Sequence, residues 1–297
     1  MKTTYWIFVL CLIYCVASAQ ENLQVTEKEK IFSKGTKNCF SIDIPQVKIK
    51  YVASAWKKYQ REKNKGNYDE VKGEYILSKT IVPEISADSI IIYSILTSYP
   101  TDVNLSAFVT ADDEVFFSTS LNSSISTRIN TFIRNFAVNE YRNAVNDELI
   151  AEQKKLARIE EEISNLENEN EKMEKKIKSN ERENDRLDTD IKASLKEQEV
   201  NADAIHHQQK IIATFLEDSD LKSEQEKKLK DMEKTKKKLQ KQNESLHEDF
   251  DDNVAGNKTL RKKIEENETE IIPQKKKEKD TQRLVIANVE VKLKGIQ

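Results

Sequence analysis

The sequence predicts a small α+β head, an antiparallel sheet with a packed helix, followed by a long all-α antiparallel coiled-coil hairpin. Short segments with strand-like alternation occupy residues 38–118. A seven-residue apolar repeat then runs from Leu149 to Ile271, with a break between Ile212 and Leu229. The repeat resumes after the break in a new phase, which is the pattern of a long helix folded back on itself.

The polar positions of the repeat predict how the two helices face each other. Apolar spacings that alternate between three and four residues keep one stripe toward a partner helix. When the chain is folded between Asp218 and Ser219, apolar core positions face apolar ones and most polar positions face polar ones. A buried amide can satisfy its hydrogen bonds against another amide but not against leucine. We therefore expect core asparagines to set the register, in the pairs Asn170 with Asn267, Asn180 with Asn257 and Asn184 with Asn253.

A second arrangement also satisfies these amides. In a parallel dimer or trimer, each asparagine would face its own copy. The mirror pattern favours the intramolecular hairpin, so the sequence predicts a monomeric hairpin or a homo-oligomer formed through the coiled coil. Each arm would be roughly 100 Å long at the rise of an α-helix. The hairpin covers residues 146–272, and its tip at 209–228 offers Phe215, Leu216 and Leu221 as candidate contacts.

The first nineteen residues have the pattern of a secretory signal peptide. Lys2 precedes an apolar run at 5–16, and Ala17-Ser18-Ala19 gives a small-x-small cleavage site after Ala19. The run is too short to span a bilayer, and no later apolar stretch approaches that length. Cleavage would leave Cys39 as the one cysteine, so no internal disulfide is expected. We expect a secreted or periplasmic protein without a transmembrane segment.

The head is predicted to occupy residues 38–145, after a flexible polar segment at 20–37. Alternation at 38–44 indicates a strand whose Cys39 points away from the main core face. A helix from Pro45 to Lys63 follows, with Trp56 as its core anchor. Its predicted apolar stripe comprises Val47, Tyr51, Val52, Ala55, Trp56 and Tyr59. Four further strands are expected, at 75–82, 89–97, 103–110 and 115–118, with polar turns that imply antiparallel neighbours.

One continuous helix is expected from about residue 126 to 216, because no glycine or proline separates the head from the coiled coil. Pro273 interrupts the return arm, where the apolar repeat loses its phase. Residues 273–297 are expected to return toward the head. Within them, 281–296 reads as a helix that docks beside the head, through Leu284, Ala287 and Val291. A closing strand is the alternative.

The residues that usually carry catalysis are not brought together by this pattern. His206, His207 and His247 all lie in the predicted coiled coil, so the head has no histidine for a Ser-His or Cys-His nucleophile or for a His-ligated zinc ion. The five glycines are too far apart for a phosphate-binding loop. We predict no catalytic residues, no cofactor and no metal, and hence a protein that is not an enzyme.

Charge and glycosylation motifs restrict the partner and the location. The 49 basic and 52 acidic side chains alternate along the helices, as on the solvated face of a coiled coil, so nucleic acid is not an expected partner. Asn-x-Ser/Thr sequons occur at Asn104, Asn122, Asn243, Asn257 and Asn267. The last three are predicted core positions that could not hold a glycan. This favours a bacterial envelope over a eukaryotic secretory route.

Several short motifs are similar to those of a loosely defined group of secreted proteins from Bacteroidetes. They are the signal peptide ending in Ser-Ala-Gln, Ser33-Lys34-Gly35, Ala55-Trp56-Lys57-Lys58-Tyr59 and Val71-Lys72-Gly73. In that group a small head precedes a Lys/Glu-rich helical tail. The resemblance implies the same organisation and an envelope location here, and it implies no activity.

The resulting functional prediction is a non-enzymatic periplasmic or secreted scaffold, with its head presented on a long coiled-coil arm to a protein partner that the sequence does not specify. In one alternative the protein is an envelope adaptor, or an activator of a cell-wall hydrolase, that acts through the hairpin tip. In another, the head encloses a small apolar ligand between its helix and its sheet.

Overall fold

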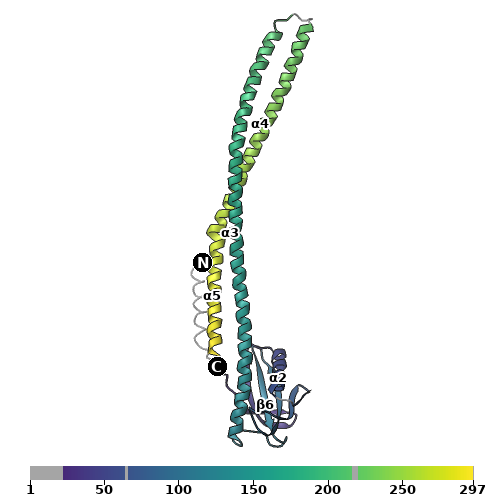
Figure 1. Cartoon of the computed structure of the whole chain (residues 1–297), viewed down its shortest axis with the longest axis vertical. Coiled ribbons are helices and arrows are strands. Elements are labelled where there is room, and N and C mark those ends of the chain that lie inside the picture. Colours follow the sequence, from purple (N-terminus) through teal and green to yellow (C-terminus); the bar gives the residue numbers. More distant parts are fainter. Residues whose placement is uncertain (1–22, 64–65, 216–219, 297) are drawn as a thin grey trace. The chain divides into compact units, whose positions relative to one another are not determined.

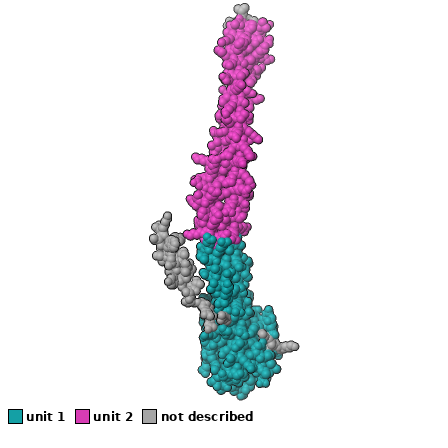
Figure 2. All heavy atoms as spheres, turned by 60° about the vertical axis from the view of Figure 1, so that its left-hand side comes forward, with its two compact units in different colours: residues 1–157, 280–297 teal, residues 158–279 magenta. Residues whose placement is uncertain are grey.

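The computed structural model describes residues 23–63, 66–215 and 220–296 (Figure 1). The predicted signal peptide at 1–19 lies outside these ranges. Two compact units are present: a head unit of residues 1–157 and 280–297, and an arm unit of residues 158–279 (Figure 2). An antiparallel sheet followed by a helical hairpin confirms the predicted fold class.

The head unit is built on a six-stranded antiparallel sheet in the order β1-β2-β6-β5-β4-β3. Consecutive strands pair at β1–β2, β3–β4, β4–β5 and β5–β6, and the remaining pair, β2–β6, places the first hairpin beside the last strand. The strands are β1 Thr26–Phe32, β2 Gly35–Pro45, β3 Asn67–Val71, β4 Glu74–Ile81, β5 Ser89–Ser98 and β6 Asp102–Thr110.

Within the described ranges, five helical segments accompany the sheet: α2 Ile49–Lys63, α3 Ser123–Ile212, α4 Asp220–Glu266, the π-helical turn η1 Asn267–Ile271 and α5 Ile272–Gly295. The 90 residues of α3 confirm the predicted single helix that joins the head to the coiled coil. The N-terminus of α3 is capped, because Asn122 Oδ1 accepts a hydrogen bond from the backbone N–H of Ile125 at 3.3 Å.

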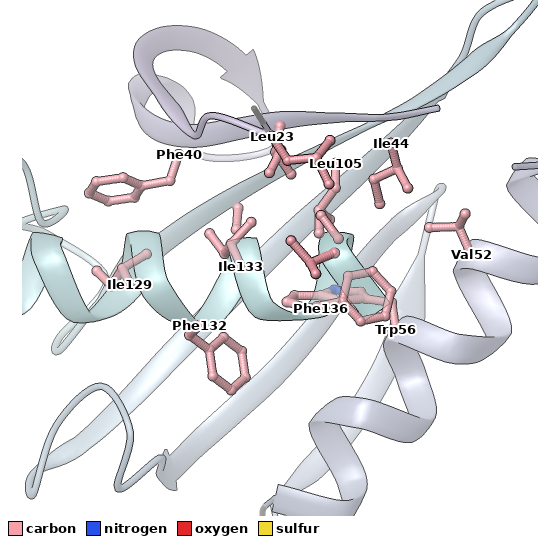
Figure 3. Packing of buried hydrophobic residues seen from close by; sticks show 14 of the residues in the cluster. Leu23, Phe40, Ile44, Val52, Trp56, Leu105, Ile129, Phe132, Ile133 and Phe136 are labelled. Atoms are coloured by element: carbon pink, nitrogen blue, oxygen red, sulfur yellow. The ribbon is translucent and has the colours of Figure 1, made fainter. Parts of the chain in front are cut away.

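The main core of the head lies between one face of the sheet and the helices α2 and α3 (Figure 3). Trp56 is fully buried, and its ring lies 4.7 Å from that of Phe136 and 5.9 Å from that of Phe132. The prediction that Trp56 anchors this core is confirmed. The predicted stripe of α2 is confirmed at Val52, which is fully buried, and is wrong at Tyr51, which is 67% exposed.

A smaller aromatic cluster covers the opposite face of the sheet. Phe32 at the end of β1 stacks on Phe108 of β6 with ring centroids 4.1 Å apart, and Tyr93 and Phe116 pack around them. Cys39 belongs to this cluster. It points away from the main core as predicted, and it is nevertheless fully buried.

The structure corrects three predictions for the head. The segment predicted to be flexible at 20–37 is ordered over its described part, residues 23–37, because β1 pairs with β2 along its whole length and Leu23 enters the core. Glu27, Lys28 and Glu29 of β1 are exposed, and the strand is held mainly by backbone pairing, which the polar sequence does not reveal. Strand β3 was not predicted as a separate strand. The strand expected at 115–118 is reduced to a single bridge between Thr110 and Phe116.

The C-terminal segment is a helix, so the closing-strand alternative is wrong. Helix α5 continues directly from α4 through η1, in which the N–H of Ile272 bonds to the carbonyl of Asn267, five residues back. The extra residue shifts the buried stripe, which confirms the loss of phase near Pro273. It also makes the expected docking residues wrong, since Leu284 and Val291 are 67% and 63% exposed while Val289 and Ile296 enter the head core.

Candidate interaction surfaces

The seam of the arm unit contains the predicted facing amides. Asn267 Nδ2 donates to Asn170 Oδ1 at 2.7 Å, and Asn180 Nδ2 donates to Asn257 Oδ1 at 2.8 Å. All four side chains are buried. Both pairs belong to one antiparallel register, the one that the sequence predicts, and each pair satisfies amides that would otherwise be desolvated without a partner.

The third predicted pair does not form a hydrogen bond in the described structure. Asn184 Oδ1 is buried without a hydrogen-bond partner, and Asn253 is partly exposed. A shallow groove of about 1050 Å³ opens here, lined by Glu181, Asn184, Asp185, Val254, Asn257, Lys258, Thr259, Arg261, Lys262 and Glu265. Gly256 lies beside Asn180 and adds no side chain to the seam. The seam is therefore polar at this level of the arm.

Nearer the tip, polar seam residues of α3 bond to the backbone of α4. Gln198 Nε2 donates to the carbonyl of Leu239 and Asn201 Nδ2 to that of Met232, each at 3.2 Å. Gln208 Nε2 donates to the side-chain oxygen of Gln225 at 2.9 Å. Mixed layers of amide and leucine are tolerated here because the amide can reach an exposed helix carbonyl, an outcome that side-chain pairing alone does not predict.

Ion pairs cross between α3 and α5 within the arm unit. Lys275 Nζ lies 2.8 Å from Glu162 and Lys279 Nζ lies 3.1 Å from Glu160. The glutamate neighbours raise the pKa of Lys275. These side chains are partly exposed to solvent, so each pair contributes little to stability, but together they match the acidic part of α3 with the lysines of the return helix.

The structure describes part of the predicted tip. Phe215 is partly buried just after α3, and Leu221 in the first turn of α4 is 59% exposed. Leu216 lies outside the described residues. Helix α4 starts at Asp220, and Asp220 stands in its first turn, where a negative charge is favourable. Among the predicted tip contacts, Leu221 is thus the side chain that the structure places in solvent.

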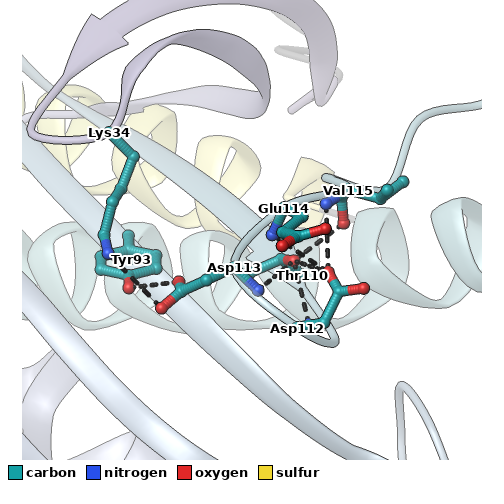
Figure 4. A network of polar contacts seen from close by, with 7 residues as sticks. All are labelled: Lys34, Tyr93, Thr110, Asp112, Asp113, Glu114 and Val115. Carbon is teal, nitrogen blue, oxygen red and sulfur yellow. Dashed lines mark hydrogen bonds and ion pairs between the residues drawn. The ribbon is translucent and has the colours of Figure 1, made fainter.

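A polar network at the edge of the aromatic cluster was missed by the sequence analysis (Figure 4). Tyr93 Oη donates to Asp113 Oδ1 at 2.5 Å, and Lys34 Nζ lies 3.4 Å from Asp113 Oδ2. Burial, followed by the hydrogen bond to Asp113, raises the pKa of Tyr93. The alternation of β5 could have placed Tyr93 on this face, but no local pattern links it to a turn twenty residues later.

Asp112 stabilises the turn that carries Asp113. Asp112 Oδ1 accepts backbone hydrogen bonds from Val115 at 3.1 Å and Glu114 at 3.0 Å, and these bonds lower the pKa of Asp112. A shallow cavity of about 420 Å³ adjoins the turn, lined by Gly66, Asn67, Ser78, Lys79, Ile91, Tyr93 and Asp113. The paired carboxylates are thus explained by turn structure and by Tyr93, with no reacting group between them.

A lysine and a serine approach each other on the same face of the sheet. Lys30 Nζ lies 3.2 Å from Ser106 Oγ, and burial lowers the pKa of Lys30. This pair resembles an amine-activated nucleophile. Ser106 is fully buried, however, and donates to Asn104 Oδ1 at 2.8 Å, so its proton is already engaged and no substrate can reach it. We interpret this cluster as a structural bond between β1 and the sheet.

Neither a metal site nor a membrane span emerges from the residues that the structure describes. No group of three or more His, Cys, Asp or Glu side chains there could hold a metal ion. No helix within the same ranges is both long and apolar enough to cross a bilayer. The histidines at 206, 207 and 247 are exposed on α3 and α4.

No protein-family model matches the chain, and no curated protein matches its sequence.

Proposed function

We propose that the protein is a non-enzymatic scaffold of the periplasm or cell exterior, which uses a folded-back coiled-coil arm to present binding surfaces. The observation that carries this proposal is the register of the arm. Two amide pairs, ten residues apart on each helix, are hydrogen-bonded in one alignment. A shift of the helices would place each amide against an apolar side chain, so the arm favours one fixed alignment.

Continuity of the long helix supports the same function. Ile129, Phe132 and Phe136 of α3 enter the head core, and Ile163, Ile177 and Ile191 of the same helix enter the arm seam. The two units are thus joined by helix and not by a Gly- or Ser-rich linker.

The binding surface itself is a separate question, for which the tip and the head are the two candidates. An adaptor or a hydrolase activator would use exposed tip residues such as Leu221. The apolar-ligand alternative is not carried further, because the side chains of Val52, Trp56, Phe132 and Phe136 fill the space between the helices and the sheet.

Disulfide trapping tests the hairpin. Asn184→Cys with Asn253→Cys, in a Cys39→Ala background, replaces two facing seam residues that share no hydrogen bond. At low protein concentration we expect a cross-linked monomer that migrates faster in a non-reducing gel. The matched control is Asn184→Cys with Leu246→Cys, which is one heptad out of register and should not cross-link. A cross-linked dimer, or equal trapping in both variants, would contradict the proposed monomeric hairpin.

Deletion of the tip then separates the two candidate surfaces. Residues 209–228 are replaced by a short glycine loop that joins the two arms. If a partner captured by the full chain from envelope extract is lost after the deletion, the tip is the binding surface. If capture is unchanged, the tip hypothesis fails and the head carries recognition.

A further inference from the structure

The outer face of α2 is strongly basic. Between Lys48 and Lys63 the sequence contains six basic residues and one acidic residue, Glu62, which gives a net charge of +5 (6 − 1) in a chain whose total is −3. Repulsion between such cations opposes folding, and the charged side chains are not needed to bury the helix. A concentration of like charge on one helix therefore indicates an anionic partner.

The amphipathic arrangement of α2 separates the charged face from the core. Val52, Trp56 and Gln60 are fully buried against the sheet and α3. The opposite side presents Lys50, Ser54, Lys58 and Arg61 to solvent, with Lys57 partly exposed beside them. The cations thus lie along one line of the helix with spacings of three, four and seven residues, which brings them onto a common face.

Two of these cations are held in place by an aromatic ring. The Lys57 Nζ atom lies 5.2 Å from the centroid of the Tyr68 ring, and the Arg61 guanidinium lies 5.7 Å from it. Between the long side chains, the small Ser54 leaves a shallow recess of about 370 Å³, lined also by Lys57, Lys58, Arg61 and Glu62. Three cationic side chains, one hydroxyl group and the Glu62 carboxylate, which lies 3.6 Å from Lys58 Nζ, surround this recess. The cationic N–H donors and the hydroxyl group suit a phosphate oxygen.

Apolar and aromatic side chains are exposed at the start of the same helix. Ile49, which lies between Lys48 and Lys50, is 38% exposed, and Tyr51, which follows Lys50, is 67% exposed. Tyrosine with flanking lysines is typical of helices that lie at a membrane surface, where the ring sits among headgroups and the ammonium groups contact phosphate.

We propose that the outer face of α2 docks the head on a membrane surface that carries anionic phospholipid headgroups. The lysines and Arg61 contact phosphates, and Tyr51 enters the headgroup layer. A convex helix with a protruding ring fits a plane of headgroups better than it fits a single acidic peptide, which would need a groove along the helix. This inference rests on the proposed scaffold function, to which it adds a surface for the head, and it does not require the hairpin tip to bind anything.

Vesicle sedimentation tests the proposal. The chain from Gln20 onward holds every described residue, and it is mixed with vesicles of phosphatidylcholine alone or with 30 to 40% phosphatidylglycerol, about the amount needed for a strongly anionic surface. We expect binding to the anionic vesicles only, weakened at least tenfold by 0.5 M NaCl. The variant Lys50→Gln/Lys57→Gln/Lys58→Gln should bind at least tenfold more weakly. The matched control, Lys236→Gln/Lys237→Gln/Lys238→Gln, removes three charges from α4 and should bind like the unmodified chain.

A fluorescent residue locates the contact. Tyr51→Trp should show a blue shift of its emission with anionic vesicles and should be quenched by brominated lipids, above a constant background from buried Trp56. Leu121→Trp, at a site that is 68% exposed and precedes α3, should show neither change. Soluble inorganic phosphate at millimolar concentration should not displace the chain, because single phosphates do not reproduce the multivalent surface.

Three results would overturn the proposal: equal loss of binding in the two triple variants, unchanged emission of Tyr51→Trp, or binding to soluble poly-glutamate but not to vesicles. The last would assign α2 to an acidic protein instead. Disulfide trapping of the arm in the same background distinguishes two outcomes. A chain that forms the intramolecular cross-link but does not bind vesicles would contradict the membrane proposal and leave the scaffold proposal intact.

Discussion

Asn267 forms a side-chain hydrogen bond to Asn170, and its backbone carbonyl accepts the π-turn hydrogen bond from Ile272. One residue therefore ends the regular register of the arm and begins the phase shift that follows. The amide pair is a polar contact inside an apolar seam. It lies where the seam changes from the phase of α4 to the phase of α5. Its removal should affect alignment as well as stability.

Replacing one partner of this pair should destabilise the arm. Asn170→Leu leaves the Asn267 amide buried against an apolar side chain, which costs about 1–3 kcal/mol. Asn170→Leu/Asn267→Leu should recover this loss, because two leucines pack as an ordinary core layer. Urea unfolding followed by far-UV circular dichroism gives both values, with exposed Lys172→Gln as a control. A single variant as stable as the unmodified chain would argue against the pairing.

The π-turn should make Pro273 tolerable. In a regular helix the proline would lack a hydrogen bond and clash with the preceding turn, at a cost of about 3 kcal/mol. Deletion of exposed Thr269 removes the extra residue, joins the two phases of the seam and imposes this cost on the return helix. Pro273→Ala should relieve it in the deletion variant and have a much smaller effect in the full chain. Thermal unfolding of the four proteins forms the complete cycle, and equal effects of Pro273→Ala in both backgrounds would contradict the interpretation.

The head should depend strongly on Trp56. Trp56→Ala removes the side chain that joins α2 to α3 and should lower the free energy of unfolding by about 3–5 kcal/mol. Tyr51→Ala, five residues earlier on the same helix, removes an exposed ring and should change it by less than about 0.5 kcal/mol. Denaturant unfolding followed by near-UV circular dichroism distinguishes the two. Similar losses of stability in both variants would contradict the assignment of the Trp56 face of α2 to the core and of the Tyr51 face to solvent.

Alkaline conditions should weaken the head through its buried tyrosines. Burial raises the pKa of both Tyr93 and Tyr68, and the hydrogen bond to Asp113 adds to the effect at Tyr93. An unfolded tyrosine has a pKa of about 10. Because the folded-state pKa lies higher, the stability from the neutral phenol is fully present below pH 10 and is lost as the pH rises through the folded-state pKa.

Tyr93→Phe tests this pH dependence. The fall of stability above pH 10 should become shallower in this variant, while the exposed Tyr99→Phe serves as the control. Urea unfolding at neutral pH and at two values above pH 10 provides the measurement. An unchanged slope would show that Tyr93 is not shielded in the folded head.

Glycosylation should be confined to one sequon. Asn104, Asn243, Asn257 and Asn267 are buried, whereas Asn122 is partly exposed at the start of α3. If the chain is secreted by mammalian cells and recovered folded, peptide mapping should find glycan at Asn122 at most. A folded product with glycan at Asn257 would be incompatible with the seam.

The sequence predicted the arm better than the head, for a physical reason. The register of a coiled coil is determined by the polarity of its core side chains, so Asn170 and Asn180 indicate their partners directly. Strand β1 owes its position to backbone pairing, and its charged side chains gave no signal. The phase after residue 271 depends on one extra residue in a helical turn, a backbone feature that apolar spacing shows only as a loss of pattern. Leu284 was consequently assigned to the buried stripe in place of Val289. The network of Lys34, Tyr93 and Asp113 joins three distant segments and required the fold.

The phase shift is confined to the five residues of η1. The length of the arm is therefore independent of the contacts that α5 makes with the head core. Val289 and Ile296 enter the head core beyond the π-turn, and the amide pairs lie before it or, at Asn267, at its first residue. Seven residues added to α3 and seven to α4, placed opposite each other on the tip side, would keep every facing pair and every head contact while lengthening the arm by about 10 Å. The length of the arm can therefore change in steps of one heptad without any change in the residues of the head.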